Sequence, residues 1–532
     1  MGAGIRRAGR AGARAVRRGA AGRAHGCHPR GRLELSRPGG HVLQCPGPAR
    51  GGLAGDRRGV PLGAWVDGAR TGAGERVMDL AIRNGTVVTA TGEFRADIGV
   101  QNGRIVQVGG DVPAAAREVD AAELLVLPGC VDIHTHLTSF AGQRPLDGFD
   151  TGTRAAAAGG VTTICDFTHQ ADGEGLRAAL ERALADARQS IIDFTFHAVL
   201  RDPNEQALAE IPDLVAEGVA GIKVFMSQSR FTRRATDYLR AMRIAGRAGA
   251  LTAIHAEDES IIALRTAELL AEGKRGVEWF PDSRPPLAEA IAVQRAVAFA
   301  EAAEAPIYLV HLSCRGALEG LRAARARGLP VYGETRPIYL YLTRDCFNLP
   351  NGEGAKFVGQ PPLRDQADVD ALWEALRSGD LSTVCTDHIP YLSAVKLDPA
   401  HTFATIPPGV SNLETLLPML YSEGVRKGRI SLPRLVQLVA TNPARIADLA
   451  PRKGTIAPGA DADLVLFDPR LTRVVRAADM HSAADYDPFE GWQVTGWPVM
   501  TIARGEVIVE RGRVLGRSGR GRFVPRARFS TL

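Results

Sequence analysis

The stretch VLPGCVDIHTHL, residues 126–137, decides the fold that we expect for this chain. It begins as an apolar run, which is typical of a buried strand, and it ends in two histidines separated by one residue. Residues two apart in a strand point to the same face, so His134 and His136 would present two imidazoles side by side at the strand's end. Such a pair is suited to a metal ion. Two ordinary polar residues in a loop are the alternative, and the rest of the chain must decide.

Seven further apolar runs of strand length follow, separated by stretches of helical periodicity. The eight runs are LLVLPGCVDIHTH, VTTICDF, IIDFTFHAVL, AGIKVFM, LTAIHAE, IYLVHLS, PVYGETRP and STVCTDH. Intervening stretches such as EGLRAALERALADARQS carry Leu and Ala at helical spacing, with charges on the opposite face. Alternating strands and helices indicate parallel β/α construction, and eight such units predict a TIM-type (β/α)8 barrel.

Short strands with Gly-rich turns lie on both sides of the predicted barrel. MDLAIRNGTVVTATGEF begins at Met78, and KGTIAPGADADLVLFDP and MTIARGEVIVERGRVLG lie near the C-terminus. We expect both ends of the chain to meet in one small β-sandwich domain. The predicted organisation is an extension at residues 1–77, sandwich strands at 78–128, the barrel at 129–450, and further sandwich strands with a tail at 451–532.

The basic character of the chain is concentrated in the predicted extension. Residues 1–77 hold fifteen Arg and four acidic residues, a net charge of +11, so the remainder carries −5 of the overall +6. This distribution argues against a nucleic-acid partner. We expect the Arg, Gly and Ala-rich extension to be disordered or not native, with translation starting at Met78. An organelle transit peptide is the alternative.

Composition also bounds where the protein would work. No apolar run is long enough to span a membrane, so we expect no membrane partner. The seven cysteines include no CxxC pair, which favours a reduced, cytoplasmic protein.

Side chains of metal-ligand type mark five of the eight predicted strand ends, where the active site of such a barrel lies. They are His134, His136, Lys223, His255, His311 and Asp387. Each alone has a structural explanation, such as a hydrogen-bonded histidine or a helix-capping aspartate. We assign that explanation to four other strand-end and loop histidines, His197, His388, His401 and His481. Six such residues at corresponding positions instead favour a metal site.

Lys223 differs from the other five because a protonated lysine cannot bind a metal. Burial in an apolar strand would remove the proton. The neutral amine can then react with CO2 to give a carbamate, whose two oxygens can bridge two metals. A structural lysine paired with an acidic neighbour is the alternative.

This pattern resembles the amidohydrolase superfamily, and the surrounding sequence resembles its hydantoinase and dihydropyrimidinase branch. The resemblance runs from about Met78 to near the C-terminus and includes GIKVFMS, HAED, VHLSCRGAL, FVGQPPLRD and DYDPFEGWQVTGWP. It implies a binuclear centre in which His134, His136 and Asp387 hold one metal and His255 and His311 the other, bridged by N6-carboxylysine at Lys223. Zinc is the expected metal, with manganese, cobalt or iron as alternatives.

The resemblance also implies a reaction. A metal-bridging hydroxide would attack a cyclic amide or imide, a hydantoin or dihydropyrimidine, and open it to a carbamoyl amino acid. Asp387 would serve as the proton shuttle. Relatives that form homotetramers imply a homo-oligomer, and the partner would be a small-molecule substrate.

Four positions define the expected substrate pocket, three of which depart from the family pattern. Gln228 replaces a tyrosine whose hydroxyl helps to hold the oxyanion, and losing such a donor costs on the order of a hundredfold in rate. Gln360 replaces a serine and Pro408 an asparagine, for which Asn412 is a candidate to compensate. A different cyclic amide is therefore an alternative substrate. The alternative from a different functional class is a non-catalytic scaffold that resembles collapsin-response mediator proteins, but those proteins lack a full set of metal ligands.

Overall fold

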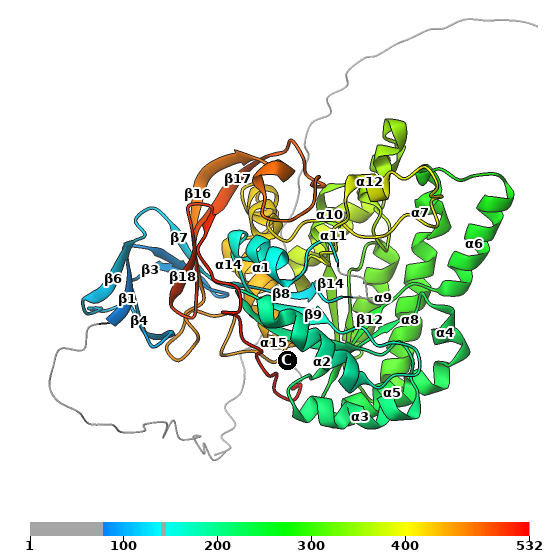
Figure 1. The fold of residues 1–532 in the computed structure, drawn as a ribbon, viewed down its shortest axis with the longest axis horizontal. Helices are drawn as coiled ribbons and strands as arrows, with labels where there is room; N and C mark the ends of the chain where they lie inside the picture. The colour runs from blue at the N-terminus through cyan, green and yellow to red at the C-terminus, as the bar shows by residue number, and fades with distance from the viewer. Residues whose placement is uncertain (1–77, 140–144, 531–532) are drawn as a thin grey trace, which may run out of the picture. The chain divides into compact units, whose positions relative to one another are not determined.

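The computed structural model describes residues 78–139 and 145–530, so the predicted extension at residues 1–77 lies outside the described residues. Eight parallel strands form a barrel surrounded by helices (Figure 1). Backbone hydrogen bonds from His136 N to His388 O (3.0 Å) and from Asp387 N to His134 O (2.8 Å) join the first strand to the segment after the last. The predicted TIM-type barrel is confirmed. Its strands are β8 (Cys130–Thr135), β9 (Val161–Phe167), β10 (Asp193–Val199), β11 (Gly221–Phe225), β12 (Leu251–His255), β13 (Ile307–Leu309), β14 (Val331–Thr335) and β15 (Thr383–Val384).

The helices form because apolar residues recur on one face of each. In α9, Ala317, Leu318, Leu321 and Ala324 are buried at spacings of three and four while the charged residues stay outside. The helices are α1 (Phe149–Ala158), α2 (Leu176–Asp186), α3 (Glu205–Ala216), α4 (Ser229–Arg233), α5 (Ala235–Ala248), α6 (Glu259–Ala271), α7 (Phe280–Ser283), α8 (Pro286–Ala303), α9 (Arg315–Ala326), α10 (Pro337–Tyr341), α11 (Gln366–Ser378), α12 (Ser393–Lys396), α13 (Leu416–Met419), α14 (Leu432–Val436) and α15 (Asn442–Ile446).

The apolar run that opens the barrel supplies strands to two different sheets. Its first part, β7 (Leu125–Pro128), pairs antiparallel with β16 (Leu464–Val474), while its second part is β8 of the barrel. Gly129 separates the two. A Cβ atom at this position would overlap the side chain of Thr162, so the close approach requires glycine. The single strand expected from sequence is therefore two strands.

Two β-sheets pack together beside the barrel. One has the order β5-β4-β1-β6 and the other β19-β18-β17-β16-β7-β2-β3, so strands from both ends of the described chain share a sheet. Leu80, Ile98, Val126, Leu464 and Ile502 belong to their common core. The predicted β-sandwich is confirmed, whereas the exact domain boundaries stay a prediction. The strands are β1 (Met78–Arg83), β2 (Thr86–Val88), β3 (Glu93–Arg95), β4 (Ile98–Gln101), β5 (Arg104–Val108), β6 (Ala115–Asp120), β17 (Gln493–Ala503), β18 (Glu506–Glu510) and β19 (Arg513–Val514).

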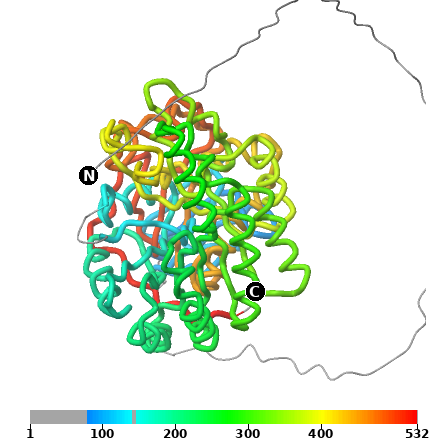
Figure 2. The backbone as a smooth tube through the Cα atoms, turned by 90° about the vertical axis from the view of Figure 1, so that its right-hand side faces the viewer, coloured from blue at the N-terminus to red at the C-terminus, as the bar shows by residue number. Residues whose placement is uncertain are grey.

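The C-terminal segment returns to the barrel. Phe194 N in β10 donates to Arg522 O (3.0 Å), and Val524 N donates to Phe194 O (2.8 Å). Figure 2 shows this red segment beside the green part of the chain. Val524 belongs to a buried cluster with Val131 of β8, Leu251 of β12 and Tyr308 of β13, and β8 is far from the other two strands in the barrel sheet. Side chains of such strands meet inside a closed barrel, so this cluster fills its interior.

Two observations bear on the expected location. Within residues 78–139 and 145–530, no helix combines the length and the apolar composition that a bilayer crossing needs. The cysteines of the same ranges carry no disulfide bond: Cys130, Cys165, Cys314, Cys346 and Cys385. The cytoplasmic location itself stays a prediction.

Candidate metal centre

All six predicted ligand residues line one inner cavity of about 140 Å³ at the C-terminal ends of the barrel strands. His134 lies in β8, Lys223 in β11 and His255 at the end of β12, while His136, His311 and Asp387 follow strands β8, β13 and β15. The other residues of the wall are Phe225, Arg336, Gln360, Ile389, Pro408 and Gly409. The strand ends therefore meet as parallel construction requires.

Three of the predicted ligands form a close group. The potential ligand atoms of His134, His136 and Asp387 all lie within 4.8 Å of one another. Asp387 Oδ1 is 3.2 Å from His134 Nε2 and 2.9 Å from His136 Nε2. The backbone of Asp387 (φ 49°) and that of His311 (φ 42°) are left-handed. Residues other than glycine rarely adopt this conformation, and such strain is concentrated at functional sites.

Buried carboxylates orient two of the histidines. His134 Nδ1 is 2.7 Å from Glu334 Oε1, and His255 Nε2 is 2.7 Å from Glu257 Oε2. Arg284 in turn donates to both oxygens of Glu257, at 3.0 and 2.6 Å. These contacts leave His134 Nε2 and His255 Nδ1 as the nitrogens that can bind a metal. Histidines that ligate metals are commonly held in this way. Sequence reasoning missed both carboxylates.

The protonation states in the inner cavity suit a metal site. Lys223 is 1% exposed, and its Nζ has no hydrogen-bond partner within the described part of the chain. Burial lowers the pKa of Lys223 to about 8, although Asp387 and Glu334 oppose this shift. Burial also lowers the pKa of His311 well below its usual value, and its Nδ1 has no partner in the same part of the chain. A lysine with a lowered pKa and a histidine nitrogen with no competing partner, beside a carboxylate, are a donor set that fits divalent metals.

Sequence reasoning also missed Arg336, which directly follows β14 and is 0% exposed. Its Nη1 lies 3.0 Å from Asp387 Oδ2. Burial acts to raise the pKa of Asp387, but Arg336 and His134 hold it well below its usual value. Glu334 and Arg336 are separated by one residue at the end of the seventh apolar run, as are His134 and His136 at the end of the first. That repeated spacing marks both residues as candidates for the strand-end site, although it does not record which side chains they contact.

A larger outer cavity of about 640 Å³ adjoins the inner one. His136, Phe225, Ile389 and Pro408 line both, so the two cavities are direct neighbours. Much of the outer wall is apolar, including Leu146, Leu392 and Val395. None of the four histidines predicted to be structural is among the residues that line either cavity.

The four predicted substrate contacts lie at different depths. Gln228 lines the outer cavity, Gln360 the inner one and Pro408 both, whereas Asn412 lines neither. The backbone N–H of Asn412 donates to His388 Nδ1 (3.2 Å), and its buried side-chain amide makes no hydrogen bond within the described residues. The substrate-binding role of all four residues stays a prediction.

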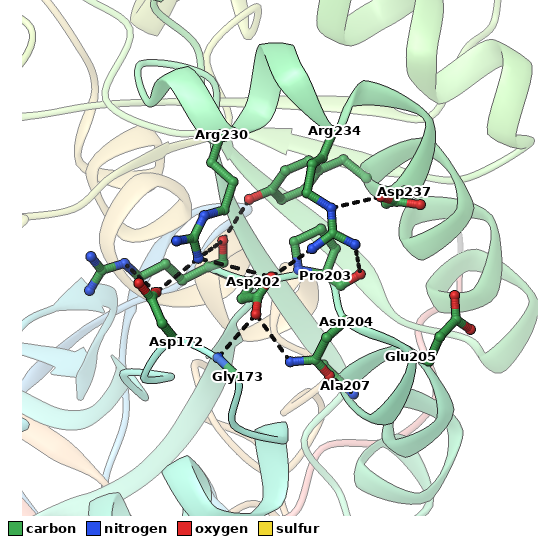
Figure 3. A network of polar contacts seen from close by, with 12 residues as sticks. Asp172, Gly173, Asp202, Pro203, Asn204, Glu205, Ala207, Arg230, Arg234 and Asp237 are labelled. Atoms are coloured by element: carbon green, nitrogen blue, oxygen red, sulfur yellow. Dashed lines mark hydrogen bonds and ion pairs between the residues drawn. The ribbon is translucent and has the colours of Figure 1, made fainter.

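A network of ion pairs holds the rim that carries Gln228. Gln228 is the residue before α4, and Arg230 of this helix pairs with Asp172 at 2.8 Å. Asp202, after β10, accepts from Arg234 Nη1 (2.7 Å) and from Gly173 N (3.0 Å), as Figure 3 shows. These contacts tie α4 to the loops after β9 and β10, and so fix the backbone at Gln228.

Comparisons with known proteins agree with this architecture. The model of the amidohydrolase family matches residues 125–508, and that of the urease alpha-subunit N-terminal domain matches residues 65–129. A D-hydantoinase from Rhizobium radiobacter is 41% identical over 458 residues, which cover 85% of this chain and 100% of the relative. A crystal structure of dihydropyrimidinase from Brevibacillus agri is 40% identical, with a TM-score of 0.83 over 85% of this chain and 100% of that one. An L-hydantoinase (dihydropyrimidinase) structure from Arthrobacter aurescens is 31% identical, with a TM-score of 0.78 and coverage of 85% and 100%. The chain therefore belongs to the amidohydrolase family, within its hydantoinase and dihydropyrimidinase branch.

Proposed function

We propose that this protein is a binuclear metallohydrolase that opens a cyclic amide or imide ring, a hydantoin or a dihydropyrimidine, to a carbamoyl amino acid. The observation that carries the proposal is the inner cavity, which is lined by six side chains of metal-ligand type from five barrel strands. The similarity to D-hydantoinases over 98–100% of the length of those relatives supports the choice of reaction.

Each side chain of the centre has a proposed role. His134, His136 and Asp387 would hold one divalent metal, and His255 and His311 the other. Lys223, as its carbamate, would bridge the two. Its burial and lowered pKa favour the neutral amine that reacts with CO2. Zinc is the proposed metal because imidazole and carboxylate oxygen suit it, with manganese, cobalt or iron as alternatives.

When bound, the metals would supply an activated water and polarise the carbonyl that is attacked. Asp387 would accept a proton from this water and return it to the ring nitrogen as the C–N bond breaks. The close contacts of Asp387 with His134 and His136 keep its carboxylate at the centre. Phe167 and Phe225, whose ring centroids lie 5.0 and 5.1 Å from Lys223 Nζ, exclude water from this amine.

The outer cavity sets the proposed substrate. Its volume of about 640 Å³ and its apolar wall fit a ring that carries an apolar substituent. Gln228, Gln360 and Pro408 would contact the substrate. Because these residues depart from the family pattern, we propose a substrate selectivity that differs from that of the relatives. We also propose a cytoplasmic location from the cysteine usage and a homotetramer by family resemblance. Light scattering of the purified protein would test the oligomeric state.

Ring opening, followed as loss of ultraviolet absorbance, tests the proposal with the full chain supplied with zinc, manganese or cobalt. The panel of test substrates comprises dihydrouracil, hydantoin, the D- and L-enantiomers of 5-substituted hydantoins, allantoin and dihydroorotate. Lys223→Ala should lose turnover together with bound metal, measured by atomic emission. Lys427→Ala is the matched control, because Lys427 is 54% exposed and lies outside both cavities.

Two results would contradict the proposal. Purified protein that binds no divalent metal under any of these conditions would favour the non-catalytic scaffold. Turnover by Lys223→Ala at the rate of the unaltered protein would remove the bridging role of this lysine. Carbon-13 NMR of protein equilibrated with labelled CO2 would test the carbamate independently of activity.

A further inference from the structure

We propose that Arg336 is a further catalytic residue of this centre, donating a hydrogen bond from Nη1 to the substrate oxygen on which negative charge develops. The proposal rests on the ring-opening function proposed above. It assigns to Arg336 the task of the family tyrosine that Gln228 replaces.

The geometry of Arg336 leaves one nitrogen for a ligand. Nε lies 3.2 Å from Thr386 O and Nη2 lies 3.4 Å from Asp387 O, so both donate to the backbone after β15. Nη1 forms an ion pair with Asp387 Oδ2 at 3.0 Å but makes no hydrogen bond within the described residues. A fully buried donor without an acceptor is costly, and a substrate oxygen in the cavity would satisfy it.

The surroundings of the guanidinium group hold it in the cavity wall. A Cβ atom at Gly359 would lie 3.0 Å from Arg336 Nη1, so glycine leaves the room that the group needs. On another side, the ring centroid of Tyr339 is 5.6 Å from Cζ, within the range of cation–π attraction. The group is therefore positioned before any substrate arrives, which is the condition for effective stabilisation of a transition state.

The alternative donor does not reach this space. Gln228 lines the outer cavity and is not among the residues of the inner cavity, whereas Arg336 lines the inner cavity together with all six predicted metal ligands. Arginine also carries a positive charge, and hydrogen bonds from charged donors to anions are roughly twice as strong as neutral ones. The chain thus keeps a donor for the oxyanion after losing the tyrosine expected at position 228.

The step that Arg336 would assist balances without a further reactant. The water oxygen forms a bond to the carbonyl carbon, and the π electron pair moves onto the carbonyl oxygen, where Arg336 donates. When this pair re-forms the C=O bond, the C–N bond breaks and the nitrogen takes the proton held by Asp387. The attacked carbon becomes the carboxylic acid of the carbamoyl amino acid, which releases its proton to solvent as a carboxylate, so a product oxygen would remain beside Arg336.

The experiment compares Arg336→Ala, Arg336→Lys and Gln228→Ala with the unaltered full-length protein. We expect Arg336→Ala to lower kcat about 10²- to 10³-fold, with KM and bound metal little changed. Added guanidinium ion should restore part of this rate, and Arg336→Lys should lose less than Arg336→Ala. Gln228→Ala should raise KM for substituted rings and lower kcat for hydantoin much less than Arg336→Ala does.

Product binding separates this proposal from the proposed function. N-carbamoylglycine, the ring-opened form of hydantoin, is titrated into metal-loaded protein by calorimetry, and Arg336→Ala should weaken its binding at least about tenfold. Turnover and product binding that are unchanged in Arg336→Ala would overturn the role of Arg336 and leave the ring-opening function intact. Loss of metal in proportion to activity would also overturn it, because Arg336 would then only position Asp387. Unaltered protein that neither opens a ring nor binds this product would reject both proposals.

Discussion

Replacing Glu334 by glutamine should weaken metal binding at the proposed centre while preserving the fold. Glu334 is 0% exposed and accepts three hydrogen bonds: from His134 Nδ1 (2.7 Å), the backbone N–H of His311 (3.0 Å) and the Tyr308 hydroxyl (2.6 Å). It therefore orients two proposed ligands on different strands. A glutamine can keep its carbonyl oxygen toward His134 and His311 and turn its amide toward Tyr308, so the substitution mainly removes the charge.

The magnitude follows from that lost charge. A hydrogen bond to a charged group contributes about 1.5–3 kcal/mol and a neutral one about 0.5–1.5 kcal/mol. The difference of about 1–1.5 kcal/mol corresponds to roughly tenfold in a binding constant. Mutation of the residues that hydrogen-bond to ligating histidines typically lowers metal affinity about 10–100-fold. We therefore expect Glu334→Gln to weaken metal binding by about ten- to a hundredfold.

Competition with a chromophoric chelator at constant neutral pH measures this change. Glu289→Gln is the matched control, because Glu289 is also buried and pairs with Arg364 and Ser313 outside the cavity wall. The control should lose stability in urea without losing metal affinity. A folded Glu334→Gln protein with the metal affinity of the unaltered chain would refute the argument that this carboxylate supports the ligands.

Three further predictions concern stability. Lys453→Met should cost about 3–5 kcal/mol in urea unfolding, because the buried amine pairs with Asp193 and Asp463 at 2.7 Å each; the exposed control Lys427→Met should cost under about 0.5 kcal/mol. Gly129→Ala should lower stability by about 1–3 kcal/mol, since the new methyl group would overlap Thr162, and a midpoint equal to that of the unaltered protein would contradict this packing. Burial raises the pKa of Asp147, but His388 and Ser482 lower it more, to about 2. Its ionisation therefore stabilises the fold above pH ~4 by about 2 kcal/mol, and this contribution disappears as the pH falls to ~2; Asp147→Asn should remove this part of the pH dependence of unfolding.

The residues that sequence reasoning identified and those that it missed differ in a systematic way. His134 and His136 were recognisable because they lie two apart at the end of an apolar run. Glu334 was missed because its partner His134 is 200 residues away, and no local spacing records that contact. Arg336 was missed for the same reason, since its significance lies in its contact with Asp387, which is far away in the sequence.

The sequence by itself determined the eight barrel strands, the sandwich at both ends and the ligand-type residues at the strand ends. Hydrophobic periodicity is local, and parallel β/α construction brings the carboxyl ends of all strands to one side. Only the tertiary structure decided that Gly129 divides one apolar run between two sheets, that Gln228 stays in the outer cavity, and that Arg336 lies in the inner one. These outcomes depend on which side chains from distant segments fill the same space, and close packing settles that competition only when the whole chain is folded.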